Sequence, residues 1–248
     1  MIFNTFGDIN KPPIVIMHGM CQDWTPMYKF MKPLEEKYYL IIPAMDGFYK
    51  DSGEFTSFED QSRQIEEYVI KNHDGKLYGF YGVSQGGLMG CELLARNKIN
   101  VEKAFLDGTY IAHQGRIAGV LSAKTFINAK HRGGKLPKAY NVVMALMGLS
   151  EDDIDMLNYV YWEASEESIR SNMIQNYTYH LKPQIANSNT YIVMCCGSKE
   201  PYAKKSHKML KAYVKDYKEI ILEGLGHGQM CYKYSEELCK LIIREWNA

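Results

Sequence analysis

Residues 82–86 read Gly-Val-Ser-Gln-Gly and lie between a strand-like and a helix-like segment. The preceding residues 77–81 are apolar and aromatic, which is typical of a buried strand. The following residues 86–95 begin with small side chains and continue with helix formers, with Leu88 and Cys91 spaced for one apolar face. A Gly-x-Ser-x-Gly pattern in this context predicts a sharp, strained turn that exposes the serine, with glycines where side chains would collide. Without that context, the same five residues would fit an ordinary turn or a helix-capping serine.

Strand-like and helix-like segments alternate along much of the chain. The predicted strands are residues 13–17, 38–42, 77–81, 103–106, 190–196 and 219–222. A capped helix is expected from Ser57 to Lys71, and a final helix from about Gln229 to Glu245. This alternation predicts an α/β protein with a doubly wound, mostly parallel sheet.

The strand pattern disappears between Tyr110 and Pro183. Ser150 and Ser165 are each followed by acidic residues, which is typical of helix starts. We expect residues 1–110 and 184–248 to form the core and residues 111–183 to form a helical cap inserted over the sheet edge. The alternative is a separate helical domain with no role at the site.

Charge and cysteine content limit the classes of partner. Lys plus Arg equals Asp plus Glu at 29 each, which gives no support for binding to nucleic acids or anionic membranes. Neither a leader-like N-terminus nor a long apolar run is present, so we expect a soluble, cytoplasmic protein with no membrane partner. The six cysteines fall mostly in apolar segments, which favours reduced core thiols and no structural metal.

Three landmarks follow strands in a set order: His18-Gly19, the Gly82–Gly86 turn and Gly226-His227-Gly228. In these landmarks the chain resembles the α/β-hydrolases, and the resemblance covers nearly its whole length. It implies a serine-based active site at the strand ends. The segment before Pro12 is shorter than the paired strands usual in that family, so the sheet is expected to lack one antiparallel edge strand.

The resemblance assigns roles to individual residues. A serine hydroxyl needs an adjacent imidazole to accept its proton, and Ser84 and His227 would fill these two roles. The usual place for the acid that orients the histidine follows the strand after the cap, which makes Glu200 the first choice. Asp107 occupies an alternative position for the acid in this fold. Each carboxylate also has an ordinary explanation: Glu200 as a helix-start residue and Asp107 as a turn residue before glycine.

The resemblance also places an oxyanion hole. Backbone N–H groups of Gln85 and Met20 would stabilise the negative charge of a tetrahedral intermediate, with Cys21 as a substitute for Met20. His18 is expected to be a buried, hydrogen-bonded structural histidine.

The chemistry predicted from these residues is hydrolysis of a carboxylic ester or related acyl substrate through an acyl-serine, with no cofactor. The partner is then a small acyl substrate. Thioesterase, carbon–carbon bond hydrolase and cofactor-free haloperoxidase activities remain open, because similar triads support them. A ligand-binding or signalling protein on a hydrolase scaffold is an alternative of a different class.

Overall fold

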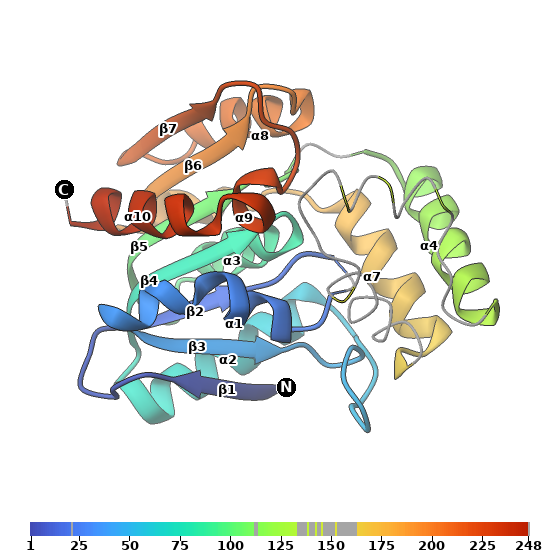
Figure 1. The fold of residues 1–248 in the computed structure, drawn as a ribbon, viewed down its shortest axis with the longest axis horizontal. Helices are drawn as coiled ribbons and strands as arrows, with labels where there is room; N and C mark the ends of the chain where they lie inside the picture. The colour runs from blue at the N-terminus through green and yellow to red at the C-terminus, as the bar shows by residue number, and fades with distance from the viewer. Residues whose placement is uncertain are drawn as a thin grey trace.

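The structure, a computed structural model, describes residues 1–20, 22–111, 114–132 and 163–247, together with the single positions 138, 142, 145 and 152. Within these residues a seven-stranded sheet forms the centre of the molecule (Figure 1). The strand order is β1-β3-β2-β4-β5-β6-β7, and every neighbouring pair is parallel except β1 with β3. The strands are β1 (Ile2–Phe6), β2 (Pro13–Met17), β3 (Tyr39–Ala44), β4 (Lys76–Val83), β5 (Asn100–Asp107), β6 (Tyr191–Gly197) and β7 (Tyr217–Leu222).

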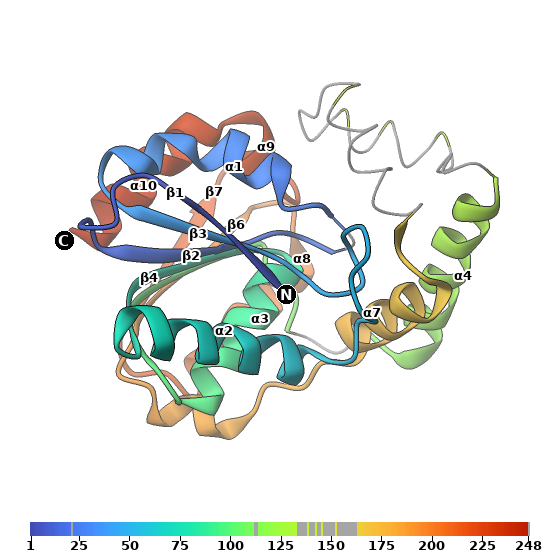
Figure 2. The ribbon, with the colours of Figure 1, turned by 90° about the horizontal axis from the view of Figure 1, so that it is seen from below.

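Helices cover both faces of this sheet. Figure 2 shows α1, α9 and α10 on one face and α2 and α3 on the other. The helices of the described residues are α1 (Thr25–Met31), α2 (Phe58–His73), α3 (Gln85–Arg96), α4 (Arg116–His131), α7 (Glu166–Thr178), α8 (Pro201–Lys211), α9 (Gln229–Lys233) and α10 (Ser235–Trp246), with short 3-10 turns η1 (Lys32–Glu36) and η2 (Pro183–Asn187). None of them combines the length and apolar composition that a membrane span requires.

The predicted doubly wound, mostly parallel α/β sheet is confirmed. All six expected strands are present, with ends that differ by at most a few residues. Ile14 and Val15, whose side chains point to opposite faces of β2, are both fully buried. Burial on both faces explains why the central strands are continuous apolar runs. One strand, β1, precedes Pro12 and pairs antiparallel with β3 at the sheet edge, in place of a strand pair.

The final helix differs from the prediction. It is divided into α9 and α10 at Tyr234, whose backbone leaves the helical conformation at φ −127° and ψ 43°. Glu236 and Glu237 lie in the first turn of α10. Acidic residues favour a helix N-terminus, so they mark a second start inside an apolar pattern that is otherwise continuous.

Two predicted helix starts are confirmed by their capping bonds. The Ser57 hydroxyl accepts a hydrogen bond from the backbone N–H of Asp60, and the Ser165 hydroxyl accepts one from Ser168 N–H. The helix start expected at Ser150 lies outside the described residues.

The cysteines that the structure describes are buried free thiols, as predicted: Cys91, Cys195, Cys196, Cys231 and Cys239. Cys21 lies outside the described residues.

Helices α4 and α7 pack against each other beyond the carboxyl ends of the parallel strands (Figures 1 and 2). The N-terminus of α7 is attached to the loop between β3 and α2. There Ser168 Oγ accepts a hydrogen bond of 3.0 Å from Phe55 N–H and donates one of 2.5 Å to Glu54. The Glu54 carboxylate also accepts a hydrogen bond from Ser165 Oγ. The loop therefore holds the start of α7 against the core.

Candidate active site

Ser84 lies in the turn between β4 and α3. Its φ of 55° and ψ of −115° put a non-glycine residue in a rarely occupied region of backbone conformation. A Cβ atom on Gly82 would lie 2.3 Å from the Gly86 carbonyl oxygen, and one on Gly86 would lie 2.4 Å from the Met17 carbonyl oxygen. Both glycines are therefore required by close backbone contacts. The backbone N–H of Ser84 donates a 2.7 Å hydrogen bond to the carbonyl of Asp107, which ties the turn to β5.

Three segments distant in sequence meet at Ser84. The Ser84 Oγ atom lies 3.0 Å from Nε2 of His227, and Nδ1 of His227 lies 2.6 Å from Oε2 of Glu200. These residues follow β4, β7 and β6 respectively, at the edge where the carboxyl ends of the parallel strands meet. The serine, the histidine and the first-choice acid expected from the sequence thus form a continuous hydrogen-bonded chain.

Glu200 is buried, with 2% of its surface exposed, and both of its carboxylate oxygens accept hydrogen bonds. Gly197 N–H donates to Oε1 at 2.7 Å, and the Tyr110 hydroxyl donates to Oε2 at 3.1 Å. Burial opposes ionisation of Glu200, but the hydrogen bond and charge of His227, with the donors on Gly197 and Tyr110, hold its pKa below the usual range. An ionised Glu200 can accept a hydrogen bond from Nδ1–H of His227.

Asp107, the alternative acid, lies at the end of β5 and is 3% exposed. Its Oδ2 accepts a 3.1 Å hydrogen bond from the hydroxyl of Tyr81. Burial and the nearby charge of Glu200 raise the pKa of Asp107 to about 7. Its environment favours the neutral carboxyl, whereas that of Glu200 favours the carboxylate.

The residues expected to form the oxyanion hole come from two elements, the start of α3 and the segment after β2. Gln85 is the first residue of α3, where backbone N–H groups have no partner within the helix. Met20 follows β2, and its sulfur lies 3.3 Å from Nδ2 of Asn176 on α7. Cys21, the substitute for Met20, is outside the described residues. His18 is buried, as expected, and its Nδ1 lies 2.9 Å from the Gly19 carbonyl oxygen, whereas its Nε2 has no hydrogen-bond partner among the described residues.

Tyr110 was not found from the sequence. Besides its bond to Glu200, its ring centroid lies 4.7 Å from that of His227, at an interplanar angle of 37°. Tyr110 comes from the segment after β5, and no local motif marks it. Only the folded sheet brings Tyr110 to Glu200 and His227, which lie 90 and 117 positions further along the chain.

Comparisons with known proteins identify the family of the chain. A family model described as alpha/beta hydrolase fold matches residues 12–137, just over half of the chain. The chain belongs to the alpha/beta hydrolase family. Membership supports hydrolase activity. No curated protein matches the chain.

Solved structures of other alpha/beta hydrolases extend the similarity over almost the full length. An alpha/beta hydrolase family protein from Desulfitobacterium hafniense is 22% identical, with a TM-score of 0.79 over 98% of this chain and 99% of that chain. An esterase from Exiguobacterium antarcticum is 16% identical, with a TM-score of 0.78 over 99% and 95%. The enol-lactonase from Burkholderia xenovorans LB400 is 15% identical, with a TM-score of 0.76 over 100% and 96%. At these identities the likeness establishes the shared fold.

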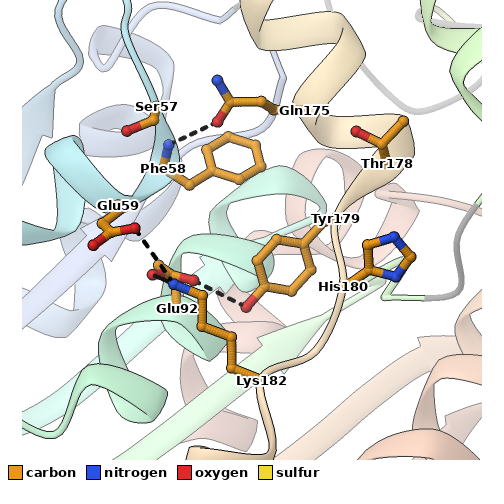
Figure 3. A pocket seen from close by; sticks show the side chains of 9 residues that line it. All are labelled: Ser57, Phe58, Glu59, Glu92, Gln175, Thr178, Tyr179, His180 and Lys182. Atoms are coloured by element: carbon orange, nitrogen blue, oxygen red, sulfur yellow. Dashed lines mark hydrogen bonds and ion pairs between the residues drawn. The ribbon is translucent and has the colours of Figure 1, made fainter.

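A cavity of about 280 Å³ lies on the flank of this hydrolase, where the segment after α7 crosses α2 and α3 (Figure 3). Lys182 reaches across it, with Nζ 2.7 Å from Oε1 of buried Glu92 and 3.6 Å from Oε2 of Glu59. The Tyr179 hydroxyl lies 3.5 Å from the other oxygen of Glu92. None of Ser84, His227 and Glu200 is among the residues that line it. These bonds attach the end of the α4–α7 segment to α3.

Proposed function

We propose that this alpha/beta hydrolase cleaves a small carboxylic ester or related acyl substrate through an acyl-serine intermediate. The observation that carries the proposal is the hydrogen-bonded chain from Ser84 through His227 to Glu200, which begins at a strained turn. Its distances of 3.0 and 2.6 Å fit proton transfer from a serine to an imidazole that is oriented by a carboxylate.

Acylation would begin as Ser84 Oγ attacks the substrate carbonyl carbon. Nε2 of His227 accepts the hydroxyl proton while the new carbon–oxygen bond forms, and the carbonyl oxygen becomes an oxyanion. The imidazolium is stabilised by ionised Glu200 at Nδ1. When the intermediate collapses, the bond to the leaving alcohol breaks and His227 returns the proton to it, which leaves an acyl-serine.

Deacylation would repeat these transfers with water as the nucleophile. His227 accepts a proton from water as it attacks the acyl carbon, and then protonates Ser84 Oγ as the free acid leaves. In both steps we assign stabilisation of the oxyanion to the backbone N–H groups of Gln85 and Met20. The position of Gln85 at the start of α3 supports this assignment, because its N–H faces away from the helix.

We further propose that residues 111–183 form a cap over this site, on a core of residues 1–110 and 184–248. The placement of α4 and α7 beyond the carboxyl ends of the strands supports the cap (Figure 1). The contact between Asn176 on α7 and Met20 also supports it, because it brings the cap to the loop that carries a proposed oxyanion donor. A capped site favours a small substrate that can be enclosed.

The experiment that tests the function is hydrolysis of p-nitrophenyl acyl esters of increasing chain length by the wild type and by Ser84→Ala. We expect the wild type to be active, and Ser84→Ala to fold normally and lose at least about 10³-fold in kcat, since it lacks the nucleophile. A fluorophosphonate should label the wild type and not the variant. Lactones and thioesters belong in the same panel, because one structural neighbour is an enol-lactonase.

Two results would contradict the proposal. Equal turnover by Ser84→Ala would remove the acyl-serine step. A folded wild type that neither hydrolyses the panel nor reacts with the fluorophosphonate would favour a ligand-binding or signalling protein on the hydrolase scaffold.

A further inference from the structure

Oxygen Oε2 of Glu200 accepts two hydrogen bonds from different parts of the chain. Nδ1 of His227 lies 2.6 Å from it, and the hydroxyl of Tyr110 lies 3.1 Å from it. The other oxygen of Glu200 is bonded by Gly197 N–H at 2.7 Å. Tyr110 and His227 therefore form hydrogen bonds to the same carboxylate oxygen of Glu200.

The ring of Tyr110 makes a second contact within the same group of residues. It lies 4.7 Å from the imidazole of His227, centroid to centroid, while its hydroxyl reaches Glu200. One side chain thus touches both residues, and it limits rotation of the imidazole as well as of the carboxylate. Contact with the Tyr110 ring restricts the rotamers of His227 at little cost, because the aromatic ring is itself rigid.

Tyr110 remains a hydrogen-bond donor over the pH range in which an esterase works. Burial, the charge of Glu200 and the hydrogen bond between them raise the pKa of Tyr110 far above its usual value. The hydroxyl therefore stays protonated next to the carboxylate. A donor aimed at a carboxylate favours its ionised form.

We propose that Tyr110 is a positioning residue of the Ser84–His227–Glu200 chain, whose hydroxyl holds Glu200 while its ring holds His227 in line with Ser84. The inference rests on the proposed function, since positioning has a catalytic effect only if His227 acts as the base. The roles assigned to Ser84, His227 and Glu200 do not themselves require a positioning role for Tyr110.

Other ionisable groups around Glu200 also influence its pKa, so a test of Tyr110 must leave them unchanged. Asp107 on β5, Cys195 and Cys196 on β6 and His207 on α8 all interact electrostatically with Glu200. Tyr110→Phe changes none of these groups, because it removes one hydroxyl and retains the ring. Tyr202→Phe is a matched control. Its ring lies 6.0 Å from that of Tyr110, and the side chain is 52% exposed.

The test combines kinetics with a titration that does not depend on activity. We expect Tyr110→Phe to lower kcat on a p-nitrophenyl ester about tenfold with KM unchanged, because a hydrogen bond to a charged group is lost. Tyr202→Phe should stay within about twofold. In ¹³C NMR of the glutamate side-chain carboxyls, the signal lost in Glu200→Gln identifies Glu200. Its pKa should be higher in Tyr110→Phe than in the wild type and unchanged in Tyr202→Phe.

A double variant distinguishes positioning from a general structural role. If the Tyr110 hydroxyl acts through Glu200, Tyr110→Phe should cause no further loss of kcat in a Glu200→Gln background. Fully additive losses, or an unchanged Glu200 titration in folded Tyr110→Phe, would overturn the proposal. A raised Glu200 pKa in a protein without hydrolase activity would support the Tyr110–Glu200 coupling and contradict the proposed function.

Discussion

At the scale of single residues, two buried carboxylates near His227 differ in their hydrogen-bonding partners. Glu200 is bonded by His227, Gly197 and Tyr110, and its pKa is lowered. Asp107 is bonded by Tyr81, and its pKa is raised. The two carboxylates are similarly buried, so their partners make the difference. Glu200 has partners that stabilise its charge and is ionised, whereas Asp107 is readily protonated.

This difference predicts which carboxylate supports turnover. Glu200→Gln should lower kcat/KM by about 10³- to 10⁴-fold, because the neutral amide neither stabilises the imidazolium nor fixes its tautomer. Asp107→Asn should stay within about threefold, since asparagine resembles the neutral carboxyl and can still accept from Tyr81. Steady-state kinetics at pH 6.5 on the same ester, with circular dichroism to verify folding, provide the measurement. The reverse ranking would make Asp107 the acid.

The sequence contains local signals for part of this site. Ser84 and His227 each lie in a glycine-flanked motif, and Glu200 could be proposed from its place after a strand. The choice between Glu200 and Asp107 depends on distances to His227 and on donors from other segments. Tyr110 depends on the same tertiary contacts. Tertiary contacts of this kind leave no periodic pattern or fixed spacing in the sequence, so they could not be predicted from it.

At the scale of secondary structure elements, prediction succeeded where the signal was local. Strands buried on both faces appeared as apolar runs, and the starts of α2 and α7 were marked by Ser57 and Ser165. The break between α9 and α10 was missed because Tyr234 continues the apolar stripe while its backbone leaves the helix. Periodicity reports which face is buried, and it is less sensitive to a single non-helical residue.

The attachment of α7 to the core can be tested on the helix itself. Ser168→Ala removes the acceptor of Phe55 N–H and a donor to Glu54, and both bonds join α7 to the β3–α2 loop. We expect a loss of about 1–2 kcal/mol in the free energy of unfolding, because a buried N–H is left without its partner. Hydrogen exchange should rise in α7 and around Phe55.

Ser171→Ala is the control on the same helix. Ser171 bonds Glu167 within α7, so this change should alter stability by less than about 0.5 kcal/mol and leave exchange in the loop as it is in the wild type. Equal effects of the two substitutions would mean that the loop does not hold α7.

At the scale of the whole molecule, the sheet brings residues from the ends of five strands, β2, β4, β5, β6 and β7, to one edge. Asp107 lies at the end of β5, between β4 and β6 and next to the site, and only 3% of its surface is exposed. An ionisable group buried at the end of a central strand affects the stability of the entire fold, because its charge is fully solvated only when the chain unfolds.

The pH dependence of folding should therefore show the effect of Asp107. Its pKa is about 7 in the folded protein, against 3.8 for an aspartate in water, so between these values the folded state binds the proton more tightly than the unfolded state. Its contribution to stability is complete below about pH 3.8 and is lost as the pH rises through about 7. The loss is at most about 4 kcal/mol, because each pKa unit corresponds to about 1.4 kcal/mol. The lowered pKa of Glu200 has the opposite effect: its contribution to the stability of the fold is lost as the pH falls.

Comparison of the wild type with Asp107→Asn isolates this contribution. Urea unfolding from pH 4.5 to 8.5 should show the variant gaining stability relative to the wild type as the pH rises, with most of the change complete near pH 8. The exposed Asp51→Asn serves as the control, and its stability should follow the wild type across the range. A constant difference between Asp107→Asn and the wild type would show that Asp107 has the same pKa in the folded and unfolded states, and that its surroundings at the end of β5 solvate its charge as well as water does.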